Sequence, residues 1–370
     1  MIAGCAAALG LVLGCSPSSR PGADAAMGAA DAMDATSSAD ASAACVQRAA
    51  TLQAALDAAS ATHAAALGIA TADCPTLSLV GGEGVASDSL FRVGSVTKTY
   101  IAAVIVSLAR EGTLSLDDAL DEHALPVPEA SGITVRQLLN HTSGIFDYTD
   151  APACEEPATR QTPQAPEALV ALATAHPPYF APGTSWRYSN TNYILLGMVA
   201  ERVSGASLGE IVRARALDPG QLAHTFFDGE EPLVGTLAPG YSASGTDVTN
   251  LYHPSWAWAA GAMVATVGDL ADWATALYGA AIVDEAGRAL LTESPVDIGG
   301  GISYGLGTMI TSAAIAGNAG VGIGHGGDIS GYHTMAFYFP AKQTTIAAAV
   351  TSDAASANDV FVAALDALFP

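Results

Sequence analysis

The stretch Phe91-Arg92-Val93-Gly94-Ser95-Val96-Thr97-Lys98 decides how the rest of the sequence is interpreted. Apolar residues recur at helical spacing from Ser95 to Arg110, so we predict a helix that begins at Ser95. Three residues separate Ser95 from Lys98, which places both side chains on one face of that helix, one turn apart. A neighbouring amine can accept the proton of a serine hydroxyl, and the first N–H groups of a helix are free to bind an oxyanion. The stretch therefore predicts a nucleophile, Ser95, with Lys98 as its partner.

The scarcity of lysine supports a chemical role for Lys98. The chain contains only two lysines, Lys98 and Lys342, beside eleven arginines. Burial can lower the pKa of a lysine into the neutral range, whereas an arginine stays protonated. A Ser-x-x-Lys spacing alone occurs often by chance, but a lysine kept on an apolar helix favours proton transfer.

A second candidate element is Tyr188-Ser189-Asn190, which follows the turn-rich segment Ala181-Pro182-Gly183-Thr184. In an extended backbone, Tyr188 and Asn190 point to the same side. A nearby ammonium such as that of Lys98 would lower the pKa of Tyr188 and favour its phenolate, and the sequence leaves the resting protonation of both groups open. The Asn190 amide offers a donor and an acceptor that can position Lys98 and a substrate amide. Taken alone, the segment is equally consistent with a surface turn.

A third candidate element is His325-Gly326-Gly327-Asp328, which precedes a predicted strand. Gly326 and Gly327 allow a substrate to lie close to the backbone. We expect His325 to hydrogen-bond Tyr188 or the substrate, and the alternative is a structural histidine. His325, Asp328 and His333 do not follow a metal-ligand spacing, so we expect no metal and no cofactor.

Together, the three elements resemble the serine β-lactamase and D-alanyl-D-alanine carboxypeptidase superfamily. The similarity is greatest to the secreted serine DD-carboxypeptidases and to the class C β-lactamases and related esterases. It extends over about residues 50–368. Further segments in the style of this superfamily are Leu138–Gly144, Pro182–Gly197, Ser255–Gly261 and Gly324–Tyr332.

The resemblance implies a role for each matching residue. Ser95 would be acylated, and Lys98 and Tyr188 would share the general base and general acid work. Asn190 would bind the substrate amide, and the backbone N–H groups of Ser95 and Asp328 would form the oxyanion hole. The implied substrate and oxyanion site consists of Asn190, His325, Gly326, Gly327, Asp328 and Trp256. His325 would replace the lysine of most lactamases, and Trp256 would line the cleft.

The order of predicted elements indicates the fold class. Strands are expected near both ends of the chain, at 65–72, 76–80, 304–310, 333–339 and 344–351. Helices are expected at 46–61 and 358–369, and residues of about 116–300 are mainly helix and loop. We predict an α/β (α+β) fold. An antiparallel sheet is built from both chain ends and flanked by helices, with an inserted helical lobe and a cleft between the two.

The N-terminal region indicates export. Residues 2–14 are apolar, end before Cys15 and are too short to span a membrane, so residues 1–15 are predicted to be a signal peptide with a lipoprotein cleavage box. Cys15 would then carry a lipid anchor, and we expect the chain to contact the membrane only through this anchor. Residues 16–44 are mostly Ala, Asp, Ser and Gly and are predicted to be a disordered linker, followed by a hydrolase domain at 45–370. The expected location is the bacterial cell envelope, or secretion.

Composition narrows the set of partners. The net charge of −23 excludes nucleic acid as a partner, because such a surface repels phosphate. Beyond the export region the cysteines are Cys45, Cys74 and Cys154, whose spacing does not suit zinc. One disulfide can form among them in an oxidising compartment, and the sequence leaves its pairing open. We expect a monomer.

The leading functional hypothesis is a serine acyl-transfer hydrolase, D-alanyl-D-alanine carboxypeptidase-like, that acts on peptidoglycan peptides and is acylated by β-lactams. Such an enzyme must hold a terminal carboxylate, yet no arginine follows Arg288. In addition, Gly326 follows His325 where many relatives have threonine. An esterase or a β-lactamase on the same machinery is therefore a serious alternative. The third hypothesis is a non-catalytic penicillin-binding or scaffold protein.

Overall fold

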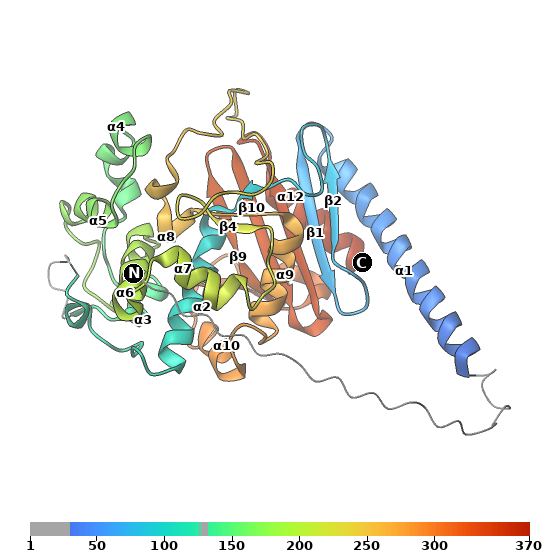
Figure 1. Cartoon of the computed structure of the whole chain (residues 1–370), viewed down its shortest axis with the longest axis horizontal. Coiled ribbons are helices and arrows are strands. Elements are labelled where there is room, and N and C mark those ends of the chain that lie inside the picture. The colour runs from blue at the N-terminus through green and yellow to red at the C-terminus, as the bar shows by residue number, and fades with distance from the viewer. Residues whose placement is uncertain (1–29, 126, 128–131) are drawn as a thin grey trace, which may run out of the picture. The chain divides into compact units, whose positions relative to one another are not determined.

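An eight-stranded antiparallel sheet, built from both ends of the chain, carries the fold (Figure 1). The computed structural model describes residues 30–125, 127 and 132–370. The strand order is β2-β1-β11-β10-β9-β8-β7-β6. The strands are β1 (Ala65–Thr71), β2 (Leu77–Gly81), β6 (Val296–Gly299), β7 (Ile302–Tyr304), β8 (Met309–Thr311), β9 (Gly322–Ile329), β10 (Tyr332–Phe339) and β11 (Thr344–Val350).

The pairing of β1 with β11 joins the two chain ends. Its register runs from Ala65 opposite Val350 to Thr71 opposite Thr344. This confirms the predicted antiparallel sheet. The single strand predicted at 304–310 is wrong: β7 ends at Tyr304, and a turn precedes β8. The chain reverses there because Gly307 adopts a φ of +69°, a left-handed conformation that glycine tolerates.

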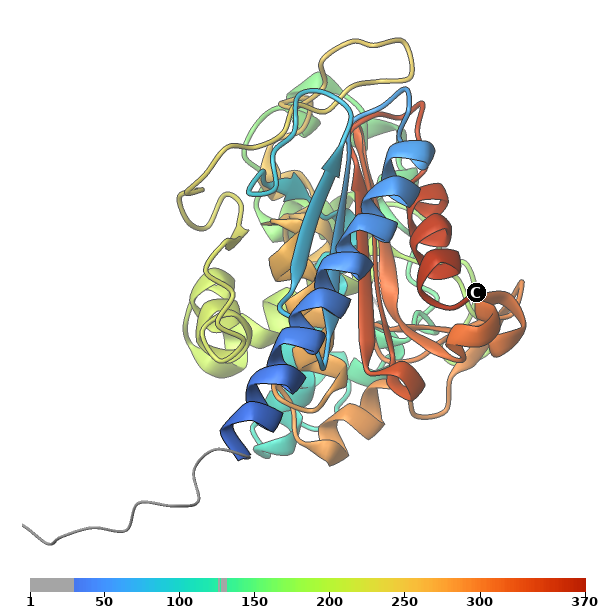
Figure 2. The same ribbon diagram turned by 90° about the vertical axis from the view of Figure 1, so that its right-hand side faces the viewer.

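Both faces of the sheet are covered, because its strands are apolar on both sides. In β10, Ala336 and Tyr338 pack into the cluster that contains the helix α9 (Val267–Tyr278). Phe337 and Phe339 pack on the other face, against α1 (Ala30–Ala59) and α12 (Ala357–Leu368). Figure 2 shows α1 and α12 side by side over this face.

The remaining helices gather mainly beyond the sheet, on the side far from β1 and β2 (Figure 1). They are α2 (Thr97–Arg110), α3 (Val135–Leu139), α4 (Pro157–Arg160), α5 (Pro166–Thr174), α6 (Asn190–Ser204), α7 (Leu208–Val212), α8 (Trp258–Gly261), α10 (Glu285–Leu291) and α11 (Ala313–Ala316). The predicted lobe boundaries of 116–300 need correction, because β6 within them belongs to the main sheet. A second sheet, β3-β5-β4, consists of β3 (Phe91–Arg92), β4 (Thr225–Phe227) and β5 (Met263–Ala265).

The first described helix, α1, begins earlier than predicted. It starts at Ala30, so the linker predicted at 16–44 is helical from Ala30 onward. The physical reason is the high helix propensity of alanine, which recurs through this segment. Residues 44–370 form one compact unit. The predicted signal peptide and Cys15 lie outside the described residues, and within those residues no helix is long and apolar enough to cross a membrane.

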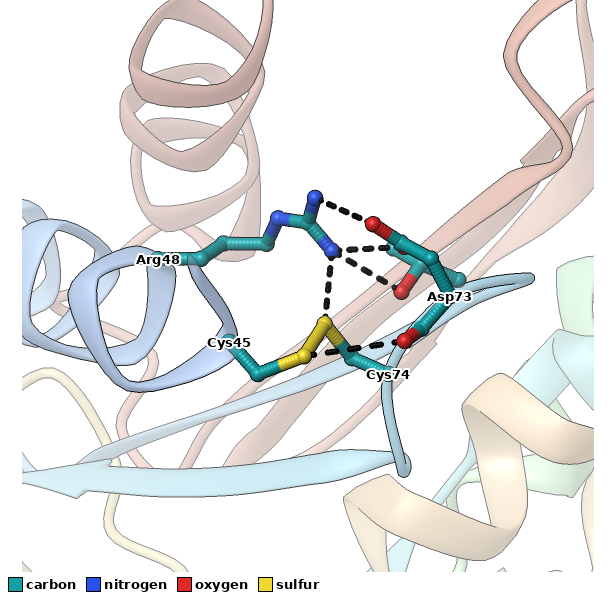
Figure 3. The surroundings of a disulfide bond; sticks show 5 residues. Cys45, Arg48, Asp73 and Cys74 are labelled. Carbon is teal, nitrogen blue, oxygen red and sulfur yellow. Dashed lines mark hydrogen bonds and ion pairs between the residues drawn. A yellow bond between two sulfur atoms is a disulfide. The ribbon is translucent and has the colours of Figure 1, made fainter. Parts of the chain in front are cut away.

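A disulfide ties α1 to the turn between β1 and β2. It joins Cys45 to Cys74, which settles the pairing that the sequence left open, and Cys154 is a buried free thiol. Beside the disulfide, Arg48 forms an ion pair with Asp73 at 2.8 Å (Figure 3). The two contacts hold the C-terminal part of α1 on the sheet.

Candidate active site

Ser95 lies where β3 turns into α2, directly against strand β9. The backbone reverses at Gly94, whose φ is +50°. An added Cβ at Gly327 would lie 2.0 Å from the Val93 carbonyl oxygen, and one at Gly94 would lie 2.8 Å from the Asp328 nitrogen. Only glycines allow this close approach. It brings the backbone of Gly327 and Asp328 against the turn that carries the half-buried Ser95.

Lys98 is fully buried one turn further along the helix. Its Nζ lies 2.9 Å from Ser95 Oγ, 2.8 Å from Asn190 Oδ1 and 2.7 Å from the Ala260 carbonyl oxygen. Burial lowers the pKa of Lys98 from 10.5 to about 7, and the Asp147 carboxylate opposes that shift. A neutral amine has two N–H bonds and one lone pair. The two acceptors take the N–H bonds, so the lone pair is left facing the Ser95 hydroxyl.

Tyr188 lies beside Lys98 and Ser95. The Lys98 Nζ lies 4.9 Å from the centre of its ring. Burial raises the pKa of Tyr188 above its usual value, and the neighbouring Ser95 hydroxyl only partly opposes this. The raised pKa favours a protonated phenol at Tyr188, a protonation state that the sequence left open. Its hydroxyl is buried and has no hydrogen-bond partner among the described protein groups.

Asp147, which the sequence analysis did not single out, orients Asn190. Its Oδ2 accepts hydrogen bonds from the backbone N–H and the side-chain Nδ2 of Asn190, both at 3.0 Å. This fixes the amide orientation and turns Asn190 Oδ1 toward Lys98. Burial raises the pKa of Asp147, and the hydrogen bonds from Asn190 and Thr149 oppose that shift. The sequence offered only a weak signal, the turn-forming spacing of Asp147 and Thr149.

A cavity of about 230 Å³ opens in front of Ser95. Trp256 and Tyr252 form an aromatic wall, and Asn190 and Asp328 lie at the same opening. The residues that line it are Gly94, Ser95, Tyr148, Thr149, Asn190, Tyr252, Trp256, Ala257, Ala260, Gly261, Asp328, Ile329 and Ser330. This described lining includes no arginine or lysine. Arg92, just behind it, forms a buried ion pair with Asp228 at 2.6 Å.

His325 lies in β9, beside Tyr304. It is buried and does not line the cavity; its Nε2 lies 2.9 Å from the Tyr304 hydroxyl, and its ring centre is 6.4 Å from that of Tyr188. The expected hydrogen bond to Tyr188 is not formed, and His325 bonds Tyr304 instead, while its expected contact with the substrate stays a prediction. Alternate residues of a strand share a face, so His325 lies on the same face of β9 as Gly327, which packs on the Ser95 turn. Burial lowers the pKa of His325 to about 3, so its ring is neutral.

The other residues of the motif His325-Gly326-Gly327-Asp328 lie further along the same strand. Gly326 and Gly327 lie in β9, where Gly327 contacts the Ser95 turn. The Asp328 backbone faces the cavity, but its carboxylate is exposed and accepts a hydrogen bond from His333 at 2.5 Å. The described residues contain no group of three His, Cys, Asp or Glu side chains suited to a metal ion.

A family model described as Beta-lactamase matches residues 49–369. The chain belongs to the beta-lactamase family. The D-stereospecific amidohydrolase from Streptomyces sp. shares 32% identity with it at a TM-score of 0.76, covering 84% of this chain and 96% of that one. The penicillin-binding protein from Bacillus halodurans has a TM-score of 0.73 at 24% identity over 82% of this chain and 95% of that one, and so shows the fold alone.

Curated relatives match over shorter segments. Penicillin-binding protein 4* of Bacillus subtilis is 31% identical over 139 residues, which is 38% of this chain and 31% of that protein. Protein flp of Staphylococcus aureus (strain MW2) is 30% identical over 194 residues, 50% of this chain and 37% of that protein. This chain thus spans about a third of the length of these relatives. The matches support a beta-lactamase-family serine hydrolase.

Two further residues of this beta-lactamase-family site escaped the sequence analysis. His141 and Tyr304 are completely buried, and their side chains lie 3.2 Å apart beside Tyr188 and His325. His141 belongs to the segment Leu138–Gly144, which the resemblance singled out without assigning a role. Tyr304 ends a short strand and has no distinguishing pattern in the sequence.

Proposed function

We propose that this chain is a serine amidohydrolase that works through an acyl-enzyme at Ser95. The observation that carries the proposal is the fully buried Lys98, whose pKa is lowered to about 7 and whose Nζ lies 2.9 Å from Ser95 Oγ. A buried lysine tuned to neutral pH and in contact with a serine is an activated nucleophile pair. A scaffold protein has no need of such a lysine.

The chemistry follows from the resting protonation states. The neutral Lys98 accepts the Ser95 proton while Oγ attacks the substrate carbonyl carbon. The N–H groups of Ser95 and Asp328 would hold the oxyanion. Tyr188, a protonated phenol, donates its proton to the leaving amine and recovers one from Lys98. Water then attacks the ester, and the same groups return the proton to Ser95.

The electrostatics of the cavity favour a substrate without a free carboxylate near the scissile bond. His325 occupies the position where relatives carry a lysine, yet its ring is neutral, and the described cavity lining has no cation. Arg92 is already paired with Asp228. A carboxylate needs a charge partner when it leaves water. We therefore place amides with a D-configured acyl part, the stereochemistry named for the Streptomyces relative, ahead of peptides that end in D-alanyl-D-alanine.

The same observation supports an esterase as the second candidate, since an ester also lacks the carboxylate. The two differ in the leaving group, because an amine must be protonated as it departs whereas an alkoxide leaves more easily. Tyr188 is protonated at rest and lies beside Ser95, which favours the amide.

The test compares four reagents on one preparation. A D-amino-acid amide, a short acyl ester, a D-alanyl-D-alanine peptide and a penicillin are each followed by product release and by intact-protein mass spectrometry. We expect turnover of the amide and a covalent adduct that Ser95→Ala abolishes. Ser107→Ala, on the same helix, is the matched control. Release of D-alanine without amide turnover would establish the carboxypeptidase instead, and the absence of any Ser95 adduct would refute the hydrolase.

We also propose that the domain works outside the cytoplasm, in the cell envelope or secreted. The Cys45–Cys74 disulfide supports this, because such bonds persist in oxidising compartments. Alkylation of the protein from cell fractions under non-reducing conditions tests it. Two protected thiols in an envelope fraction would agree with export, and reduced protein in the cytosol would contradict it.

A further inference from the structure

The Tyr304 hydroxyl lies between two buried histidines. It is 3.2 Å from His141 Nε2 and 2.9 Å from His325 Nε2, and all three side chains are at most 1% exposed. His141 comes from the loop after α3, Tyr304 from the end of β7 and His325 from β9. The three side chains form one hydrogen-bonded chain through the interior.

The direction of every hydrogen bond in this chain follows from one fixed donor. The Ser189 backbone N–H can only donate, and it lies 3.2 Å from His141 Nδ1. His141 Nδ1 is therefore an acceptor, and its Nε2 carries the proton and donates to the Tyr304 oxygen. The Tyr304 proton then goes to His325 Nε2, so His325 carries its own proton on Nδ1. That proton meets the Gly326 carbonyl oxygen at 2.5 Å.

At one end of this hydrogen-bonded series, His141 contacts residues 188–190, the segment that we call the proton-transfer wall of the site. The His141 ring packs on the Tyr188 ring with centres 4.3 Å apart, while its Nδ1 holds the N–H of Ser189. Ser189 lies between Tyr188 and Asn190. His141 also has a φ of +62°, a conformation that costs a non-glycine residue free energy and persists where surrounding contacts impose it.

At the other end of the series, His325 contacts residues 326–328 of β9, which we call the oxyanion wall of the site. The bond from His325 Nδ1 to the Gly326 carbonyl orients the peptide that precedes Gly327 and Asp328. Gly327 packs on the Ser95 turn, and the Asp328 backbone faces the cavity. A single hydroxyl thus connects the segment that positions the general acid with the strand that positions the oxyanion donor.

We propose that Tyr304 is a positioning residue that keeps these two walls in register. The inference rests on the proposed acyl transfer at Ser95. Tyr304 does not line the cavity and does not touch Ser95, so it acts through His141 and His325. Removing its oxygen leaves the His141 Nε2 proton without an acceptor and frees His325 to change tautomer. A partly satisfied buried network loses its geometry.

The test uses Tyr304→Phe, with Tyr278→Phe as the matched control. Tyr278 is also buried, and its hydroxyl bonds Thr308 at 3.2 Å outside the chain. Acylation of Ser95 by an active ester is followed by stopped flow. We expect Tyr304→Phe to lower the acylation rate constant by about 10- to 100-fold with KM changed less than about 3-fold, the loss typical of a misplaced catalytic group. Tyr278→Phe should leave the rate constant within about 2-fold.

A second measurement reads the tautomers without relying on activity. Long-range ¹H–¹⁵N spectra of the wild type, assigned with His141→Gln and His325→Gln, should show His141 protonated on Nε2 and His325 on Nδ1. The opposite tautomer on either ring would overturn the proposal, even if Tyr304→Phe does not fold. So would a folded Tyr304→Phe that acylates at the wild-type rate. If the wild type forms no Ser95 adduct, the proposed function fails instead, whatever the tautomers are.

Discussion

At the scale of single residues, the decisive property is that Lys98 is buried. Its pKa of about 7, well below the usual value of a lysine, makes a neutral amine that can accept a proton accessible near neutral pH. The low pKa arises mainly from desolvation, which disfavours the ammonium. Asn190 and Ala260 then satisfy the two N–H bonds of the neutral form.

This protonation state predicts the pH dependence of catalysis. Because neutral Lys98 is the base, kcat/KM should rise with pH, with an apparent pKa near 7, and fall about tenfold per pH unit well below it. Lys98→Arg should lose about 10²- to 10⁴-fold in kcat/KM, since arginine does not release its proton. Lys342→Arg, at the other lysine of the chain, is the control. A flat profile from pH 5 to pH 8 would contradict the assignment.

Asp147 provides an independent test of the same electrostatics. Its carboxylate raises the pKa of Lys98, so Asp147→Asn should lower that pKa further. The rising limb of the kcat/KM profile should then shift to lower pH, while the maximum rate falls because Asn190 loses a charged partner. A limb that stays at the wild-type pH would show that Asp147 does not act on Lys98. The variant Asp150→Asn, nearby and paired with Arg187, is the control.

At the scale of elements, the site depends on how closely β9 approaches the Ser95 turn. We predict that Gly327→Ala lowers the free energy of unfolding by about 1–3 kcal/mol or more and abolishes acylation, because its Cβ would lie 2.0 Å from the Val93 oxygen. Chemical denaturation and mass spectrometry of the Ser95 adduct would measure the two effects.

Gly326 is the matched control for stability. A Cβ there has its nearest neighbour, the Thr334 carbonyl oxygen, at 3.8 Å, an ordinary contact. Gly326→Ala should therefore keep the free energy of unfolding within about 0.5 kcal/mol of the wild type. Equal destabilisation by both variants would mean that the strand tolerates alanine at neither position. The close approach of Gly327 to Val93 would then not explain the loss of stability.

At the scale of the whole molecule, the Cys45–Cys74 disulfide fastens α1 to the sheet across a sequence separation of 29. Closing a loop of that size restricts the unfolded chain, so the double variant Cys45→Ala, Cys74→Ala should lose about 3 kcal/mol of stability. Thermal unfolding with and without reductant measures it. The wild type should become less stable on reduction, whereas the double variant should not respond. An equal response of both would point to another reducible group.

The sequence was sufficient for features that depend on local spacing. Helical periodicity places Ser95 and Lys98 one turn apart, and their side chains are in contact in the structure. The strands at both chain ends were also visible in the sequence, because apolar runs and turn residues are short-range signals. That information was enough to predict the antiparallel sheet and the family that the chain resembles.

Tertiary structure decided which groups meet and which protons they hold. Asp147, His141 and Tyr304 have no periodic signal, since a polar residue in a loop looks alike whether it is buried or exposed. The fold brought the Tyr304 hydroxyl within 2.9 Å of His325, and burial raised the pKa of Tyr188. Spacing along the chain therefore determined the nucleophile and its amine, while burial, which no local pattern encodes, determined their protonation and the network around them.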